Sequence, residues 1–313
     1  MTRRPLQRVQ AALVARRYFI GQQTKSDIAE ELGISRFKVA RLIDLAIQEE
    51  IIRFVVTEPG DLNTELAEAL RRRHGLKAVL VLDGPDLPFP ELTQQLGLLA
   101  ARLLEETLSE GQLLGIAWGR TLAATAQALT GLPKVDVIQV AGSPAGLDFS
   151  QNPVELVHRI AGISGGTAFP IYGPMWAEDP QLMRRLRMEP SIADTMQRYD
   201  RIDVLAVGIG SWRPPDSCFC AGFPALWRDE ALAAGVRADL CATLIDDEGR
   251  IVSSPLDTLG LGLTSDQLRR VPNVIGIGGG ARKTDAIAAV LKGRWISMLV
   301  TDAGTARTLL EKT

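Results

Sequence analysis

Glycines and charged residues gather where apolar segments of the chain end, and these residues are the best suited in the sequence to bind a ligand. Each group follows one of the apolar runs 113–117, 204–207, 274–277 and 296–300. Backbone N–H groups beside glycine can approach an anion closely because glycine has no Cβ. The candidate residues are Gly119, Arg120 and Thr121; Gly208 and Gly210; Gly279, Gly280 and Lys283; and Asp302.

The charges of these residues favour an anionic ligand. Lys283 supplies a point charge, and Arg120 can present a bidentate fork to a phosphate or carboxylate. A helix is expected to begin after each turn, and helix N-termini also attract anions. Each residue has a plainer interpretation as well. Lys283 could be solvated, Arg120 could pair with a surface acid, and Asp302 could cap a helix beginning near Thr305.

The segments that carry these groups predict an α/β fold. Several of the apolar runs lack polar alternation, as do strands that are buried on both faces of a parallel sheet. Longer helical segments separate the runs, and residues 62–74 form a further amphipathic helix. In a parallel sheet the carboxyl ends of the strands lie together, and open α/β sheets bind ligands there. The predicted strands are 78–82, 113–117, 135–140, 204–207, 274–277 and 296–300.

The segment 25–44 has the pattern of a helix-turn-helix. Ala29 is small where two helices cross, and Gly33 lies in the turn, where a positive φ is easiest for glycine. Thr24 is placed to cap the first helix, with Asp27 at the capping-box position, and Ser35 is placed to cap the second. The apolar anchors of the motif are Ile28, Leu32, Ile34, Val39 and Leu42.

The second helix of this motif exposes a basic face. Arg36, Lys38 and Arg41 lie on the N-terminal half of a recognition helix, which is the part that reaches bases and phosphates in the major groove. Arginine can bind guanine through two hydrogen bonds, and lysine can neutralise phosphate. We therefore expect these three residues, with Ser35 and Lys25, to contact operator DNA. The alternative is a solvated basic face on an ordinary helical hairpin.

The charge distribution supports two domains. Residues 1–41 hold nine Lys or Arg and three acidic residues, although the whole chain has a net charge of −2. Such asymmetry suggests a polyanion partner at the basic end. Residues 51–57 are apolar and β-branched, either a strand or a connection, and Glu58-Pro59-Gly60-Asp61 marks the boundary. We expect a helix-turn-helix domain at 1–58 and a ligand-binding, oligomerising α/β domain at 61–313.

Other classes of function are disfavoured. Cys218, Cys220 and Cys241 are too few for a disulfide framework, and His74 and His158 stand alone, so we expect no metal site and no cofactor. We also expect no signal peptide, no membrane span and a cytoplasmic location.

Several motifs together resemble the SorC/DeoR-type sugar-binding transcriptional regulators. They span nearly the whole chain: the helix-turn-helix, Trp118–Leu122, Gly208–Ser211, Gly279–Lys283 with Ala286-Ile287, and Thr301-Asp302 with Thr305-Ala306. The resemblance implies an effector domain with the fold of sugar-phosphate isomerases and CoA transferases, used for binding rather than turnover. It also implies a homodimer or homotetramer that responds to a sugar or sugar phosphate and binds a pseudo-palindromic operator.

The resemblance adds one more site residue. Asp239 matches the acid of a family segment, and a carboxylate can accept hydrogen bonds from sugar hydroxyls. Asp239 could instead be a surface acid beside a helix. The chain departs from the family at two positions, with Ala238 in place of a glycine and Ala303 where an acid is common.

Two kinds of enzyme are the alternatives. A sugar-phosphate isomerase of the same fold would need a general base, for which Asp239 or Asp302 could serve, but it would not need a helix-turn-helix. A dinucleotide enzyme is suggested by the loose glycine fingerprint at 276–281, with Asp302 near the position of a ribose-binding acid. That fingerprint lies too close to the C-terminus to complete a dinucleotide fold.

Overall fold

The computed structural model describes residues 5–52, 61–144 and 152–312, and the chain divides into two compact units, 1–57 and 58–313. The expected boundary at 58–60 and most of the apolar segment 51–57 lie outside the described residues. None of the described helices has the length and apolar character needed to span a membrane.

The first unit is helical and has the arrangement of a helix-turn-helix. Its elements are α1 (Pro5–Ala15), a π-helical turn (Arg16–Ile20), α2 (Lys25–Glu31) and α3 (Arg36–Gln48). Thr24 and Asp27 form the predicted capping box at the start of α2, and Ser35 caps α3. Gly33 lies between the two helices at φ +62°. Apolar residues of all three helices form one small core, which includes Ile28, Val39, Leu42 and Ile43.

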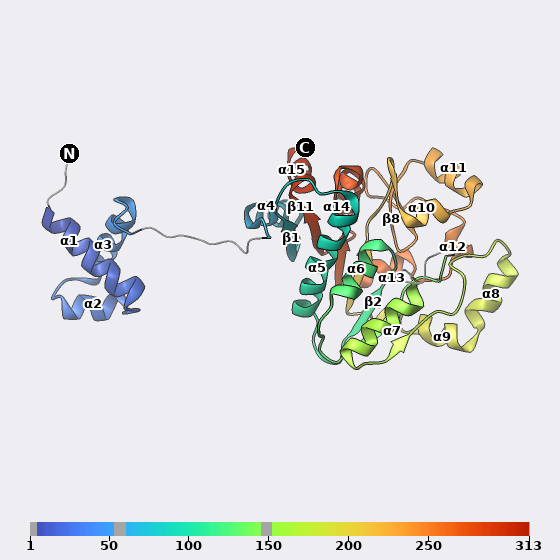
Figure 1. Ribbon diagram of the computed structural model, residues 1–313, viewed down its shortest axis with the longest axis horizontal. Coiled ribbons are helices and arrows are strands. Elements are labelled where there is room, and N and C mark those ends of the chain that lie inside the picture. Colours follow the sequence, from blue (N-terminus) through green and yellow to red (C-terminus); the bar gives the residue numbers. More distant parts are fainter. Residues whose placement is uncertain (1–4, 53–60, 145–151, 313) are drawn as a thin grey trace. The chain divides into compact units, whose positions relative to one another are not determined.

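The second unit is built on a parallel sheet, as the sequence predicted (Figure 1). Its seven strands lie in the order β1-β11-β10-β5-β2-β3-β4, and every neighbouring pair is parallel. Six of them lie at the predicted apolar runs, and their ends differ by one or two residues. The strands are β1 (Ala78–Leu82), β2 (Leu113–Ile116), β3 (Asp136–Gln139), β4 (Ala168–Phe169), β5 (Val204–Gly208), β10 (Asn273–Ile277) and β11 (Met298–Asp302).

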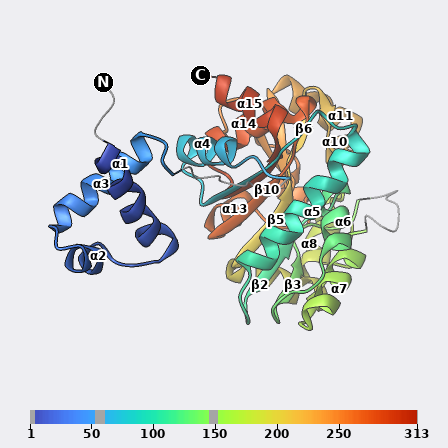
Figure 2. The ribbon, with the colours of Figure 1, turned by 60° about the vertical axis from the view of Figure 1, so that its left-hand side comes forward.

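Helices cover the sheet on both faces, which explains why most residues of its strands are apolar. In Figure 2, α5, α6 and α7 lie side by side on one face, and α4 and α15 lie together on the other. The main helices are α4 (Thr64–His74), α5 (Phe89–Thr107), α6 (Arg120–Ala128), α7 (Pro153–Ser164), α13 (Ser265–Arg270), α14 (Thr284–Lys292) and α15 (Ala303–Glu311). Short helices α8 (Pro180–Met188), α9 (Pro190–Gln197) and α12 (Leu256–Leu259) follow the outer strands.

A second, antiparallel sheet was not predicted from the sequence. It has the order β7-β6-β8-β9 and joins the main sheet directly after β5. Its strands are β6 (Gly210–Trp212), β7 (Pro215–Asp216), β8 (Val236–Leu240) and β9 (Thr243–Asp246), with α10 (Cys218–Gly222) and α11 (Ala225–Ala233) between them. An aromatic cluster that includes Trp212, Phe219 and Phe223 fills its separate core.

Close packing of α5 against α6 fixes the position of the α6 N-terminus. Gly97 of α5 lies against α6 so tightly that a Cβ there would be 2.6 Å from Ala124 Cβ. Gly162, within α7, would place a Cβ in open space. The two glycines therefore form a matched pair, because both are inside helices and only one is at a helix contact.

We predict opposite effects of the same substitution at these two positions. Gly97→Ala should lower the free energy of unfolding by about 1–3 kcal/mol through overpacking. Gly162→Ala should raise it by about 0.5–1 kcal/mol, because alanine is the better helix former. All five tryptophans lie in the second unit, so denaturant unfolding followed by tryptophan fluorescence measures this unit. Equal effects of the two substitutions would contradict the proposed role of Gly97.

Candidate functional site

A cleft lies where the carboxyl ends of β2 and β5 meet the small antiparallel sheet. Its empty volume is about 620 Å³, open solvent at its mouth included. Seven of the predicted ligand-binding residues line it: Gly119, Arg120, Thr121, Gly208, Gly210, Asp239 and Lys283. Trp118, Phe89, Met175, Ser217, Cys218 and Phe219 are among the other lining residues.

One end of the cleft is the N-terminus of α6. Gly119 is the N-cap residue at φ +135° and ψ 171°, and no side chain caps the helix. This φ is rarely adopted by residues with a Cβ, which accounts for glycine at this position. Arg120 and Thr121 are the first residues of the helix and line the cleft. An uncapped helix N-terminus presents backbone N–H groups and a partial positive charge to an anion.

Arg120 is held at this end by two contacts. Its guanidinium Nη2 donates to Asp216 Oδ1 at 2.6 Å, and its Cζ lies 4.3 Å from the centre of the Phe89 ring. The acid partner is nearly buried, with its side chain 9% exposed, and it comes from β7 of the small sheet. Arg120 thus pairs with an acid, but with a nearly buried one rather than one on the open surface.

Lys283 enters the cleft from the turn of 3₁₀ helix at Ala281–Lys283, between β10 and α14. Its Nζ donates to the backbone oxygen of Ile209 at 2.7 Å, in the segment that joins β5 to β6. Burial lowers the pKa of Lys283, and the nearby Arg120 acts in the same direction, while Asp216 and Asp239 oppose them. An anion bound beside Lys283 would relieve this cost, because it would favour the charged ammonium.

Asp239 also lines the cleft and is buried on strand β8 rather than lying at the surface beside a helix. Its Oδ1 accepts hydrogen bonds from Trp212 Nε1 at 2.8 Å and from Ser217 Oγ at 2.6 Å. Burial raises the pKa of Asp239, and these two hydrogen bonds oppose the rise. Gly210 pairs with Asp239 across the two strands, and a Cβ on Gly210 would lie 2.1 Å from Asp239 Oδ1.

The other three predicted residues lie apart from this cleft. Asp302 is the N-cap of α15, where its Oδ1 accepts from Thr305 N at 2.9 Å. Its Oδ2 accepts from the backbone N–H of Gly280 at 2.6 Å, so that donor is already used. Gly280 and Asp302 line a different hollow, together with the loop 83–87. Gly279 packs against the Asp302 carboxylate and lines neither cavity.

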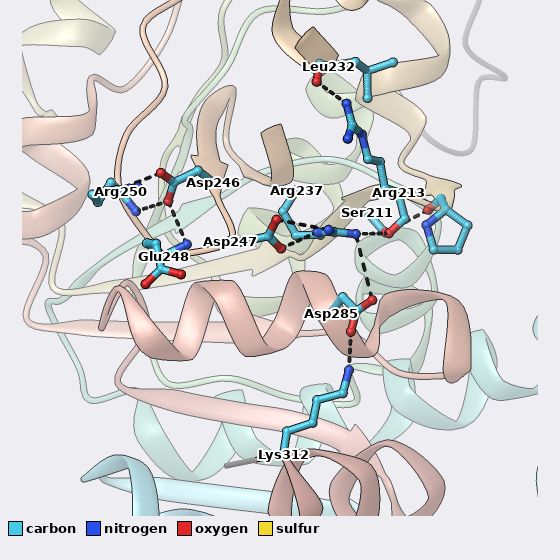
Figure 3. A network of polar contacts seen from close by, with 11 residues as sticks. Ser211, Arg213, Leu232, Arg237, Asp246, Asp247, Glu248, Arg250, Asp285 and Lys312 are labelled. Atoms are coloured by element: carbon cyan, nitrogen blue, oxygen red, sulfur yellow. Dashed lines mark hydrogen bonds and ion pairs between the residues drawn. The ribbon is translucent and has the colours of Figure 1, made fainter. Parts of the chain in front are cut away.

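A polar network ties the wall that carries Asp239 to the helix that follows Lys283 (Figure 3). Arg237 of β8 binds Asp247 through Nε at 2.5 Å and Nη2 at 3.0 Å, and its Nη1 lies 3.9 Å from Asp285 Oδ2 on α14. Arg237 Nη1 also donates to the backbone oxygen of Arg213 at 3.0 Å. This contact joins strand β8 to helix α14. Arg237 lies two residues before Asp239 in the chain, and Asp285 lies two residues after Lys283.

The first unit presents the predicted DNA-binding residues on and around α3. The side chains of Arg36, Lys38 and Arg41 are exposed, and none has a hydrogen-bond or ion-pair partner among the residues that the structure describes. Ser35 accepts the backbone N–H of Lys38 at 3.2 Å, so it serves as a cap. Lys25 is half-buried, with its Nζ 5.5 Å from the centre of the Tyr18 ring.

Comparison with known proteins identifies the class of this arrangement. Residues 60–311 match the profile of a family described as "Putative sugar-binding domain". The chain belongs to this family. It is 30% identical to the transcriptional regulator LsrR of Enterobacter sp. (strain 638) over 303 residues, covering 96% of this chain and 92% of LsrR. LsrR of Escherichia coli (strain K12) is 28% identical over 305 residues, covering 96% and 94%.

Solved structures support the same assignment over both units. The full-length sorbitol operon regulator SorC from Klebsiella pneumoniae superposes with a TM-score of 0.75 at 25% identity, covering 97% of this chain and 99% of that one. A probable sor operon regulator from Shigella flexneri covers 79% of this chain and 99% of its own, with a TM-score of 0.73 at 26% identity. This member of the sugar-binding family is a sugar-responsive, DNA-binding transcriptional regulator of the SorC type.

Several cleft residues of this family member were not identified from the sequence. Ser217 follows a short strand, β7, that carries no apolar run, so no local signal marks it. Cys241 and Ala242 form the turn between β8 and β9 at φ +47° and +69°. Hairpin turns with positive φ usually contain Asn, Asp or Gly, and their absence here hides the hairpin from sequence analysis.

We predict that the two glycines of the cleft differ in their tolerance of alanine. Gly210→Ala should lower the free energy of unfolding by about 1–3 kcal/mol, because the new Cβ must displace the buried Asp239 carboxylate. Gly208→Ala meets no atom within 4 Å and should change stability by less than about 0.5 kcal/mol. Denaturant unfolding without ligand, monitored by tryptophan fluorescence, compares them. A stable Gly210→Ala variant would disprove the close packing of Asp239 on β6.

Proposed function

We propose that the cleft binds a phosphorylated sugar, and that this protein uses the sugar as a signal without converting it. One observation carries the proposal: an uncapped helix N-terminus and Lys283 lie at the rim of the same cleft as a buried carboxylate, Asp239. Donors for an anion and an acceptor for hydroxyls are what a sugar phosphate requires. The names of the relatives, which are transcriptional regulators, agree with a role in binding.

The anion end is assigned by its charges. Arg120 is paired with Asp216, whereas the hydrogen bond of Lys283 among the described residues goes to a neutral carbonyl group. Asp216 and Asp239 favour the Lys283 cation from nearby, and a bound anion would add to their effect. The α6 N-terminus has no side-chain cap among the described residues and can receive the same anion. We assign the phosphate to this end, with Gly119, Arg120 and Thr121 supplying backbone N–H groups.

The hydroxyl end is assigned to Asp239. Because the hydrogen bonds from Trp212 and Ser217 both go to Oδ1, the second oxygen of Asp239 can accept from the sugar. The two carboxylates that an isomerase could use as a base, Asp302 and Asp239, already accept hydrogen bonds from the protein. Asp302 caps α15 in a separate hollow, and Asp239 is fixed by two donors, which suits recognition better than proton transfer.

The DNA-binding unit requires more than one copy. A single helix-turn-helix reads few bases, so specific binding uses two copies on half-sites about one helical turn, or a multiple, apart. We propose a homodimer or homotetramer on a pseudo-palindromic operator, acting in the cytoplasm where that DNA lies. Arg36, Lys38 and Arg41 form the contact face.

We propose that residues at the start of the second unit couple effector binding to DNA binding. Residues 61–63, which follow the DNA-binding unit in the chain, are anchored at the end of β1: Asn63 N donates to Val81 O at 2.8 Å, and Asp83 N to Asp61 O at 3.0 Å. The loop 83–87 borders the hollow that contains Gly280, three residues before Lys283. We propose that the ligand acts on residues 61–63 through this turn and loop.

We predict that Arg41→Ala weakens operator binding by about 1–3 kcal/mol, because the side chain is exposed on the contact face and can bind a base through two hydrogen bonds. Fluorescence anisotropy with a duplex selected by the wild-type protein measures the loss, and light scattering of the complex measures its mass. Arg201→Ala, at an exposed arginine of the second unit, is the control. A complex containing one protein chain would refute the oligomeric proposal.

We predict that Lys283→Met loses the preference for a phosphorylated effector. Methionine keeps much of the alkyl stem and removes the charge, so binding of the cognate sugar phosphate should weaken by about tenfold or more, while effector-free DNA binding is kept. Calorimetry with the sugar phosphate and with the same sugar lacking phosphate separates the two ends of the cleft. Lys292→Met, which removes an exposed lysine paired with Glu248 at 2.5 Å, is the matched control.

Linkage supplies a second measurement on the same proteins. Coupling between sites is typically about 1–3 kcal/mol and reciprocal, so operator DNA must change sugar-phosphate affinity by the factor by which the sugar phosphate changes DNA affinity. If Lys283→Met and Lys292→Met bind the effector as the wild type does, the assigned phosphate position is wrong.

A further inference from the structure

An aromatic side chain, Phe37, projects from the proposed DNA-contact face of α3. The basic residues of this face are explained by their attraction to DNA, but that attraction does not explain the presence of an aromatic residue among them. Phe37 is 83% exposed, the most exposed of the large apolar side chains that the structure describes. Val39, Leu42, Ile43 and Ala46 of the same helix are buried in the core of the first unit. The sequence motif explains those anchors and the basic residues, but it gives no reason for a phenylalanine at position 37.

The helical period places Phe37 at the centre of the exposed face. With about 100° between successive residues, Phe37 and Arg41 lie almost opposite the buried stripe. Arg36 and Lys38, its neighbours in the chain, point to either side of it. The helix therefore directs one apolar group outward between two cations, and a third cation follows one turn later.

The flanking charges identify the occupant of this face. Arg36, Lys38 and Arg41 have no acidic partner among the described residues, so the surface around Phe37 is complementary to a polyanion rather than to an apolar protein surface. Asp44 lies one further turn along the same face, and an acid is repelled by phosphates. The N-terminal half of α3 is thus the part that can enter the groove, as in other recognition helices.

In the major groove, the apolar group that a side chain can contact is the C5-methyl of thymine. We propose that Phe37 is a specificity-determining residue that packs on a thymine methyl group in each operator half-site. Arg41 lies beside it to read a base, while Arg36 and Lys38 contact the phosphates on either side. This inference rests on the proposed DNA-binding function and assigns the chemistry that one of its residues recognises.

The test uses the full chain and duplexes that the wild-type protein selects from a random-sequence library. Each thymine of the selected half-site is replaced in turn by deoxyuridine, which removes only the methyl group. At one thymine per half-site, we expect wild-type affinity to fall about three- to fivefold, as burial of one methyl-sized group predicts. Phe37→Ala should bind the thymine duplex more weakly and should bind thymine and uracil duplexes equally.

Two further variants keep the result interpretable. Phe37→Leu retains an apolar contact and should keep part of the thymine preference. Ile20→Ala removes another exposed apolar side chain of the first unit, 76% exposed, and should leave the preference unchanged. The thymine–uracil difference measured in both wild type and Phe37→Ala forms a double-mutant cycle, which isolates the contact from general losses of affinity.

The possible outcomes are distinct. An equal thymine–uracil difference in wild type and Phe37→Ala would overturn the assignment. A change in oligomer mass for Phe37→Ala, with that difference intact, would place Phe37 in an interface between copies and would also overturn it. A wild-type protein that selects no duplex would instead refute the proposed DNA-binding function itself. A thymine preference that disappears only when Phe37 is truncated would establish the contact.

Discussion

The buried carboxylate of Asp239 imposes requirements on the structure around it. An ionised group that leaves water must receive hydrogen bonds, and Trp212 and Ser217 supply them. Its position over β6 excludes a Cβ at Gly210. The small antiparallel sheet meets most of these requirements, since β6 carries Gly210 and Trp212, and β8 carries Asp239. Burial raises the pKa of Asp239, so the carboxylate gains further from a ligand that donates hydroxyl hydrogens.

The two sheets contribute different chemical groups to the cleft. The parallel sheet supplies backbone groups and cations, through the turn into α6 at Gly119 and the turn that carries Lys283. The antiparallel sheet supplies the Asp239 carboxylate, and its Asp216 pairs with Arg120. Arg237 pairs with Asp247 and lies 3.9 Å from Asp285 of α14, so polar groups also connect β8 with the helix that follows Lys283 (Figure 3). The proposed sugar phosphate would place its anion near the cations and its hydroxyl groups near Asp239.

The parallel sheet could be predicted because its signals are local. Runs such as 204–207 and 274–277 are apolar for a reason that holds anywhere in the sheet, namely burial on both faces. The antiparallel insertion has no comparable signal. Its strands are short, one hairpin turn uses Cys241 and Ala242 at positive φ, and Asp239 is buried by partners from distant parts of the chain. Seven of the ten predicted ligand residues line one cleft, but the pairing of Asp302 with Gly280 depends on tertiary contacts.

In the helix-turn-helix, by contrast, most of the structure could be predicted from short stretches of sequence. Caps at Thr24 and Ser35 and the turn at Gly33 follow from short-range rules, and the structure confirms them. Phe37 was given no role from the sequence, because the motif accounts only for the apolar anchors and the basic residues. The helical period places Phe37 on the outer face of α3, and its exposure in the structure agrees. The fold does not require an aromatic residue at this position, since the core of this unit is formed without Phe37. A single exposed apolar side chain is common on protein surfaces, so the role proposed for Phe37 depends on the basic residues around it, which have no acidic partner among the described residues.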